Sequence, residues 1–133
     1  MTDGIKLPFK VGISPTLNIR GLIATEMIEK GRVIEKCPVV TYPKNPTIIE
    51  QTIFDHYVFD WGDTHEALAL GYGSLYNHNK YPNVGFTLAF KDRYVVFTAI
   101  RDIKNGEELF INYDSSAEEP ESGYLQFDKD LDR

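Results

Sequence analysis

Short stretches of β-branched and aromatic residues, separated by turn signals, form most of the hydrophobic pattern of this chain. Residues 84–90 and 94–99 flank a Lys-Asp-Arg turn, which predicts a β-hairpin. Residues 109–113 follow the turn dipeptide Asn-Gly and are typical of a further strand. Residues 32–41 also favour a strand, in which Pro38 indicates an edge position or a bulge. The pattern therefore predicts a mostly β fold of several short strands.

Helical spacing is confined to one segment, residues 46–56. There Pro46 suits the first turn of a helix, and Ile49 and Ile53 lie four positions apart on one face. The chain has 133 residues, of which 42% are hydrophobic and 26% charged, and these values are ordinary for one globular domain. We therefore expect a single domain with little helix and a substantial core.

Cysteine and histidine usage limits the chemistry that is available. Cys37 is the single cysteine, which excludes an internal disulfide framework and a zinc cluster built from several cysteines. Its apolar neighbours favour a buried structural thiol over a nucleophile. The three histidines lack the spacing of a helical zinc site, so we expect no metal.

Charge and hydropathy indicate where the protein acts and on what. No signal peptide or long apolar stretch is visible, so we expect a cytoplasmic or nuclear protein without a membrane partner. The net charge of −6 argues against nucleic acid as a direct partner. Seven acidic side chains and two basic ones fall in residues 114–133. This segment could be a solvated tail or a negative surface that attracts a basic peptide.

The polar run LYNHNKYPN, residues 75–83, interrupts the hydrophobic pattern. Gly71 and Gly73 allow a sharp turn ahead of it, and Pro82 makes the preceding residue extended. Its three asparagines can satisfy main-chain groups through their amides. These properties predict a compact, irregular loop, which could equally be an elaborate turn with no ligand.

Two motifs around this loop resemble the signatures of the SET-domain protein-lysine methyltransferases. The segment NHNKYPN resembles the Asn-His-x-x-x-Pro-Asn signature, and GEELFINYD, residues 106–114, resembles the Gly-Glu-Glu strand that leads to a tyrosine. A looser likeness covers residues 14–35, which follow the opening strand pair of the family. The matches occur in the right order and span most of residues 10–114. The short chain most resembles the minimal viral and bacterial members.

The resemblance implies a fold and a domain organisation. It implies a mostly β, β-clip-like fold of several short sheets with a C-terminal pseudoknot, in which the Asn-His loop crosses the tyrosine strand. Residues 10–114 would form the SET domain, after an N-terminal extension of residues 1–9 and before an acidic tail of residues 115–133. The implied cofactor is S-adenosyl-L-methionine.

The resemblance also implies a set of site residues. Asn77 would hold the methionine end of the cofactor, the main chain at His78 would meet the adenine, and Tyr76 flanks this loop. Main-chain contacts would come from Arg20, Gly21 and Leu22. The catalytic tyrosine would be Tyr113, with Tyr57 as a second one, and Tyr72 and Trp61 would line the substrate channel. Pro82 and Asn83 would brace the loop. Tyr124 or Phe127 would close the cofactor cleft.

Each aromatic choice has an alternative, because the chain holds eight tyrosines and eight phenylalanines. An aromatic residue is more often part of the core than part of a site. Tyr72 and Tyr76 could face either the channel or the core. A turn that ends at Gly62 explains Trp61 as well as a channel wall does.

Three functions are compatible with these observations. The resemblance implies transfer of a methyl group to a lysine of a protein, for which a basic substrate such as a histone would suit the acidic chain. The first alternative is a catalytically inactive SET-fold module that binds a lysine-containing peptide. The second is a small β-sandwich that binds a sugar or another small ligand, with no affinity for S-adenosylmethionine. A homodimer is possible in each case.

Overall fold

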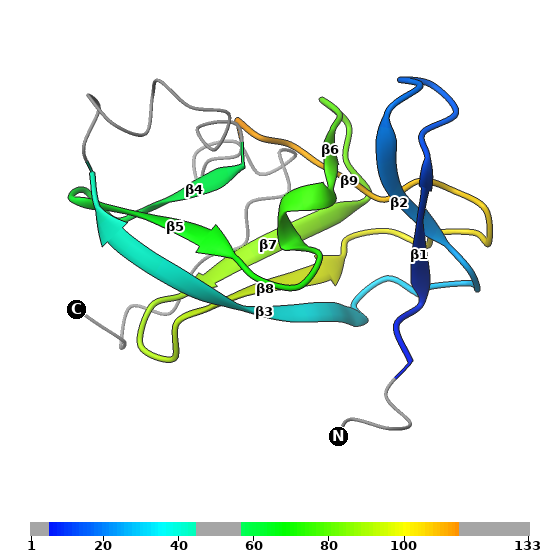
Figure 1. Cartoon of the computed structure of the whole chain (residues 1–133). Helices are drawn as coiled ribbons and strands as arrows, with labels where there is room; N and C mark the ends of the chain where they lie inside the picture. Colours follow the sequence, from blue (N-terminus) through cyan, green and yellow to red (C-terminus); the bar gives the residue numbers. More distant parts are fainter. Residues whose placement is uncertain (1–5, 45–56, 115–133) are drawn as a thin grey trace.

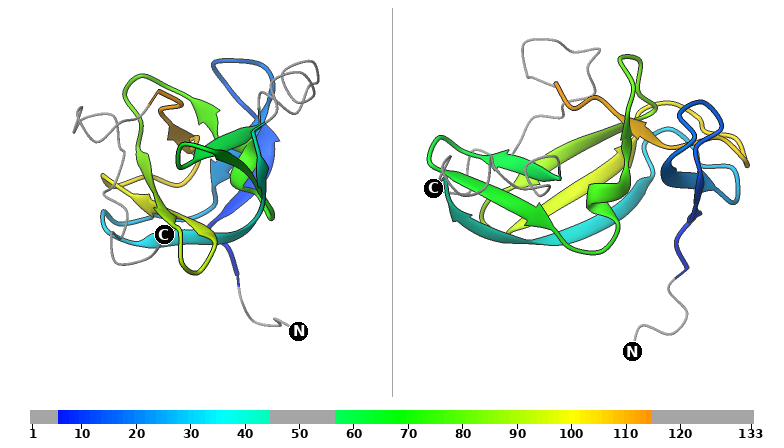
Figure 2. Two further views of the ribbon diagram at one scale, coloured as in Figure 1. Left: turned by 90° about the vertical axis from the view of Figure 1, so that its left-hand side faces the viewer. Right: turned by 45° about the horizontal axis from the view of Figure 1, so that its top comes forward.

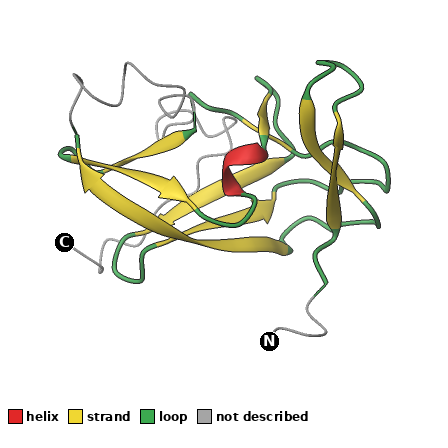
Figure 3. Cartoon of the chain, viewed as in Figure 1, coloured by secondary structure: helices red, strands yellow, loops and turns green. Residues whose placement is uncertain are grey.

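The computed structural model describes residues 6–44 and 57–114, and these form a mostly β structure with virtually no helix (Figure 1). The fold class predicted from the sequence is therefore confirmed. One 3-10 turn, η3 (Gly73–Leu75), lies between β5 and β6 (Figure 3). The described strands are β1 (Phe9–Ile13), β2 (Arg20–Ala24), β3 (Val33–Pro43), β4 (Val58–Trp61), β5 (His65–Ala69), β6 (Asn77–His78), β7 (Val84–Ala89), β8 (Tyr94–Ala99) and β9 (Phe110–Ile111).

A curled antiparallel sheet with the strand order β4-β5-β3-β8-β7 forms the larger part of the structure (Figure 2). Its edge strands approach each other across the concave side. The ring of Phe59 on β4 lies 5.4 Å from that of Phe86 on β7, and Trp61 lies 4.8 Å from Phe90. These edge-to-face contacts close the curl over an apolar interior.

Strand β3 is central in this sheet, so the edge position or bulge predicted at Pro38 is wrong. From Val33 to Pro38 the strand pairs with β8, and from Val39 to Pro43 it pairs with β5. The register shift lies instead between Val33 and Glu35. Pro38 stands where the partner changes, and its carbonyl accepts a hydrogen bond from Leu70 N–H at 2.8 Å. A proline fits this position because its missing N–H is not needed by either ladder.

Other local predictions had mixed outcomes. The predicted hairpin is confirmed as β7 and β8, whereas the strand expected over residues 109–113 is only the two-residue β9. The pattern predicted neither β4 nor β5. The predicted helix at 46–56 lies outside the described residues, as do Tyr124 and Phe127. No helix in the described part of the chain is long and apolar enough to cross a membrane.

The core lies where the curled sheet meets two smaller sheets, the β1–β2 hairpin and the parallel β6–β9 pair (Figure 1). Cys37 is buried there, which confirms the interpretation as a structural thiol. The largest side chains that are almost wholly enclosed are Tyr76, Phe97, Leu22, Ile28, Ile103 and Leu109. The first of these belongs to the polar loop, so the loop is anchored in the core.

Candidate functional site

The polar loop and the C-terminal tyrosine segment meet in the parallel pair β6–β9. Asn77 is paired with Phe110 and His78 with Ile111, although the two segments are more than thirty residues apart in the sequence. The pairing continues through Asn79, whose N–H donates to the Ile111 carbonyl at 2.9 Å. This crossing brings the Asn-His run beside Tyr113.

Asn83 holds the two segments together from within the structure. Its Nδ2 donates to the Glu108 carbonyl and its Oδ1 accepts from Phe110 N–H, both at 2.8 Å. Only 3% of Asn83 is exposed. An amide that both donates to and accepts from one strand mimics a neighbouring strand. Asn83 thus braces the crossing.

A buried carboxylate on this segment, Glu108, orients Asn77. The Nδ2 of Asn77 donates to Glu108 Oε2 at 2.8 Å and to the Arg20 carbonyl at 3.0 Å. The other carboxylate oxygen accepts a short hydrogen bond from the Ser14 hydroxyl. A Cβ at Gly21 would lie 2.5 Å from Glu108 Oε2, so only a glycine allows the carboxylate and the amide to sit this close to β2. The β1–β2 hairpin is thereby tied to the crossing.

Tyr113 lies at the exposed end of the crossing and is held at both its main chain and its hydroxyl. The hydroxyl donates to the Tyr76 carbonyl at 2.7 Å. The Tyr113 N–H donates to His78 Nδ1 at 3.0 Å, which makes Nδ1 the unprotonated ring nitrogen. The two rings lie 5.1 Å apart. The direction of the tyrosine hydroxyl is therefore fixed by the loop that contains Asn77.

The surroundings of Tyr113 favour its neutral form. Partial burial, followed by the nearby charges of Tyr57 and Glu108, raises the pKa of Tyr113 above its ordinary value. The hydroxyl therefore keeps its proton at neutral pH and stays a hydrogen-bond donor.

A second buried carboxylate lies on the core side of the loop. Glu35 accepts from the Tyr76 hydroxyl and from the Tyr72 N–H, each at 3.0 Å. Burial and the charge of Glu35 raise the pKa of Tyr76, and the same two causes raise that of Cys37. Tyr76 therefore belongs to the core by its ring and to the site by its carbonyl.

The remaining predicted site residues fall into two groups. The side chain of Leu22 is wholly buried, so it can offer a ligand only its main chain, whereas the side chain of Arg20 is exposed. Tyr72 lies at the start of η3, where 38% of it is exposed and its ring meets that of Phe9 at 5.4 Å. Trp61 lies apart, at the β4–β5 turn against Phe90. The structure thus brings together at the crossing Asn77, His78, Tyr113, the Tyr76 carbonyl and the main chain of Arg20, Gly21 and Leu22. Tyr72 lies beside Phe9 and Glu35, and Trp61 lies beside Phe90.

Sequence reasoning gave no role to Glu35, Glu108 or Ser14. Glu108 lies inside the GEELFINYD segment, where its place next to the apolar Leu109 could have indicated burial. Glu35 occupies an inward position of β3 between Ile34 and Cys37, where an acid requires an internal partner. Among the described residues, no group of three or more histidine, cysteine or acidic side chains could hold a metal ion.

Comparison with known proteins gave a consistent result. Residues 19–114 match the family model of the SET domain. A histone-lysine N-methyltransferase of Schizosaccharomyces pombe, described as specific for H3 lysine 37, is 36% identical over 98 residues. That match covers 71% of this chain and 65% of the yeast protein, so the chain spans slightly less than two-thirds of its relative's length.

Solved structures share the fold. A crystal structure from Plasmodium falciparum, assigned as a histone methyltransferase, is 29% identical with a TM-score of 0.68, and the match covers 86% of this chain and 100% of that one. A Polycomb Repressive Complex 2 structure from Chaetomium thermophilum, bound to an inhibitor, matches with a TM-score of 0.67 at 23% identity. It covers 84% of this chain and 15% of the fungal chain, and it shows the fold alone.

Proposed function

Because the chain belongs to the SET-domain family, we propose that it transfers a methyl group from S-adenosylmethionine to the side-chain amine of a lysine in a protein. The observation that carries this proposal is the β6–β9 crossing, which holds Asn77, His78 and the hydroxyl of Tyr113 in one place. Retention of all three favours an active enzyme over an inactive module of the same fold.

The residues around Asn77 suit the methionine end of the cofactor, which carries an ammonium group and a carboxylate. Within the described residues, both hydrogen bonds of the Asn77 side-chain amide use its nitrogen. No described residue donates to its Oδ1, which can accept from an ammonium group. The exposed Arg20 supplies a positive charge for a carboxylate. Gly21 and Leu22 would add main-chain contacts to the cofactor. The main chain at His78 would contact the adenine, and Tyr76 would form a wall of the cofactor cleft.

The chemistry that the bound cofactor supplies is an activated methyl group on a positively charged sulfur. The chain would bring a neutral lysine amine in line with it, and alignment alone can supply effective molarities of about 10⁵ M or more. The tyrosine walls would favour the neutral amine because they exclude water. Its surplus proton would pass to solvent after transfer.

Tyr113 would orient the amine. Its hydroxyl proton is engaged by the Tyr76 carbonyl, which leaves the oxygen free to accept a hydrogen bond from the amine. The pKa of Tyr113 is raised further above neutrality, so its oxygen would accept from the amine as a neutral hydroxyl and not as a phenolate. Tyr57 and Tyr72 would line the channel, and Trp61 would contact only a more distant part of a peptide.

We further propose a basic protein substrate, such as a histone. The net charge of −6 favours a positively charged partner, and the yeast relative is described as a histone methyltransferase. A histone substrate would place the protein in the nucleus. Two predictions are not tested by these comparisons. One is the likeness to the minimal viral and bacterial members of the family, and the other is the division of the chain into three parts at residues 9/10 and 114/115. A homodimer is a further proposal, supported by exposed apolar side chains on the β1–β2 hairpin, among them Val11, Ile13 and Ile19.

Methyl transfer can be tested directly. Purified protein is incubated with S-adenosylmethionine labelled on its methyl group and with a histone mixture or a cell extract, and labelled proteins are mapped by mass spectrometry. We expect label on a lysine, and a sharp but measurable fall in the rate of labelling in Tyr113→Phe. The control is Tyr94→Phe, which removes a hydroxyl at the far β7–β8 hairpin. Binding of the cofactor without transfer would favour the inactive module, and no binding at all would refute both.

A further inference from the structure

Glu35 is a buried carboxylate in the central strand of the curled sheet. Only 9% of it is exposed, and both of its oxygens are occupied from the loop above. Oε1 accepts from the Tyr76 hydroxyl and Oε2 from the Tyr72 N–H. Burying a charge is costly unless hydrogen bonds compensate for it. A carboxylate is therefore tolerated at this position because these two hydrogen bonds are made. The carboxylate thus links β3 to the segment that leads into β6.

The turn ahead of β6 is shaped around this carboxylate. Gly71 has a φ of +71°, and a Cβ there would lie 2.9 Å from Glu35 Oε2. A side chain at Gly73 would meet Ala69 at 2.7 Å and Cys37 Sγ at 3.1 Å. The main chain of this turn therefore passes close to both β3 and β5. Glu35 is the polar group on β3 that this turn contacts, through the N–H of Tyr72.

The contact continues from Glu35 to the proposed catalytic hydroxyl. The ring of Tyr76 is stacked on Phe97 with centroids 4.2 Å apart, and its hydroxyl is fixed on Glu35. Its carbonyl accepts the Tyr113 hydroxyl at 2.7 Å. A residue that is held at its ring and at its hydroxyl has a fixed main chain. The position of the acceptor of Tyr113 is therefore set in part by Glu35.

We propose that Glu35 is a positioning residue for the methyl-transfer reaction, acting through Tyr76 on Tyr113. This inference rests on the proposed function. Glu35 does not touch the reacting groups; it determines where the Tyr76 carbonyl stands and hence where the Tyr113 oxygen points. It also accepts a hydrogen bond from the main chain of Tyr72, so one carboxylate holds both Tyr76 of the proposed cofactor cleft and Tyr72 of the proposed channel.

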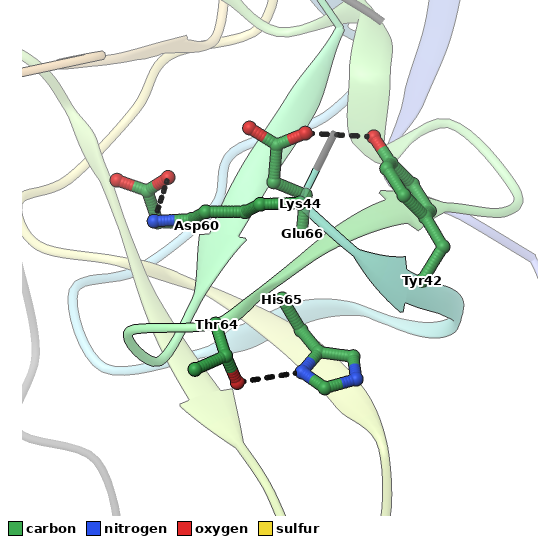
Figure 4. A network of polar contacts seen from close by, with 6 residues as sticks. All are labelled: Tyr42, Lys44, Asp60, Thr64, His65 and Glu66. Atoms are coloured by element: carbon green, nitrogen blue, oxygen red, sulfur yellow. Dashed lines mark hydrogen bonds and ion pairs between the residues drawn. The ribbon is translucent and has the colours of Figure 1, made fainter. Parts of the chain in front are cut away.

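The first test compares two isosteric variants. Glu35→Gln keeps the shape of the side chain but removes its charge and one of its two acceptor oxygens. The control is Glu66→Gln on β5, whose carboxylate accepts the Tyr42 hydroxyl at 3.2 Å, in a polar cluster away from the crossing (Figure 4). We expect kcat to fall roughly tenfold in Glu35→Gln, with KM for a peptide within about twofold, because a misplaced group costs rate more than binding. Glu66→Gln should leave both unchanged.

A double-variant comparison separates positioning from a general loss of structure. If Glu35 acts through the Tyr113 hydroxyl, Glu35→Gln should lower kcat in the parent but not in Tyr113→Phe, where that hydroxyl is already absent. An equal loss in both backgrounds, or an unchanged kcat in Glu35→Gln, would overturn the proposal. Should Glu35→Gln fail to fold, Tyr76→Phe removes the same contact with the loss of a single oxygen and serves in the same comparison.

A second readout does not depend on activity. The ring of each tyrosine is labelled with ¹³C and its titration followed by NMR, with Tyr113→Phe to assign the signal. Release of the Tyr76 carbonyl should weaken the hydrogen bond of neutral Tyr113 and lower its pKa in Glu35→Gln, but not in Glu66→Gln. An unchanged Tyr113 titration overturns the positioning role. If the parent protein transfers no methyl group, the proposed function fails, and this titration still decides whether Glu35 positions Tyr113.

Discussion

Asn83 offers the sharpest test of how the crossing is held, because both ends of its amide bind the same strand. In Asn83→Ala, the Glu108 carbonyl loses its donor and the Phe110 N–H loses its acceptor. The site is almost wholly buried, so water does not readily replace the lost partners. The change removes no apolar packing of note, and its effect is therefore that of two unsatisfied main-chain groups.

The size of the effect follows from the cost of such groups. Each buried donor or acceptor left without a partner costs about 1–3 kcal/mol, so the free energy of unfolding should fall by roughly 2–6 kcal/mol. A domain of this size has about 5–15 kcal/mol in total. Asn83→Ala should therefore be one of the most damaging single substitutions outside the apolar core.

Urea unfolding followed by circular dichroism measures this loss. The matched control is Asn79→Ala in the same loop, because Asn79 Oδ1 also accepts from a main-chain N–H, that of Tyr81 at 2.8 Å, but in an exposed position. There water can replace the amide, and we expect a loss of about 0.5–1 kcal/mol. A loss in Asn83→Ala no larger than that in Asn79→Ala would refute the reasoning.

Three further predictions concern the same region. Gly21→Ala should lower the free energy of unfolding by about 1–3 kcal/mol and weaken cofactor binding in calorimetry, because its methyl group would overlap the Glu108 carboxylate; unchanged values would contradict the close approach. Burial raises the pKa values of Tyr76 and Tyr113, so their neutral forms contribute stability that is complete below about pH 10, the ordinary tyrosine value, and is lost as the pH rises above it. Unfolding measured from pH 8 to 11 should show this loss, and Tyr76→Phe should reduce it. Cys37 should react slowly with a thiol reagent in the native protein and rapidly after unfolding, because burial raises its pKa; rapid native labelling would exclude this.

The sequence could predict those elements that are determined by a local pattern of residues. Alternating β-branched residues and a turn identified β7 and β8, and the resemblance correctly paired the Asn77 segment with the Tyr113 segment. The sequence could not predict that β6 and β9 have only two residues each. A parallel pair between distant segments produces no periodic pattern of hydrophobic residues in either segment. Pro38 was misplaced for a related reason: a strand that changes partners midway looks like an edge strand in the sequence.

The two buried acids were missed because a glutamate usually lies at the surface, whether alone in a strand, like Glu35, or beside a second glutamate, like Glu108. Glu35 and Glu108 are inside because hydroxyl, amide and main-chain donors from distant segments reach them. Those donors are brought close only by the fold. The candidate site could thus be located from its motifs, but the groups that hold it could not.

The hydrogen bond between Ser14 and Glu108 joins residues 94 positions apart. Such a contact requires closure of nearly the whole described chain, and chains dominated by distant contacts fold slowly, over about milliseconds to seconds. Asn77 shares the same carboxylate, so its amide reaches its final orientation only when both ends of the domain have met. No isolated hairpin of this protein can bind the cofactor in the proposed way. Tight binding of a ligand there would consequently be registered as a higher melting temperature of the entire domain rather than as the ordering of one loop.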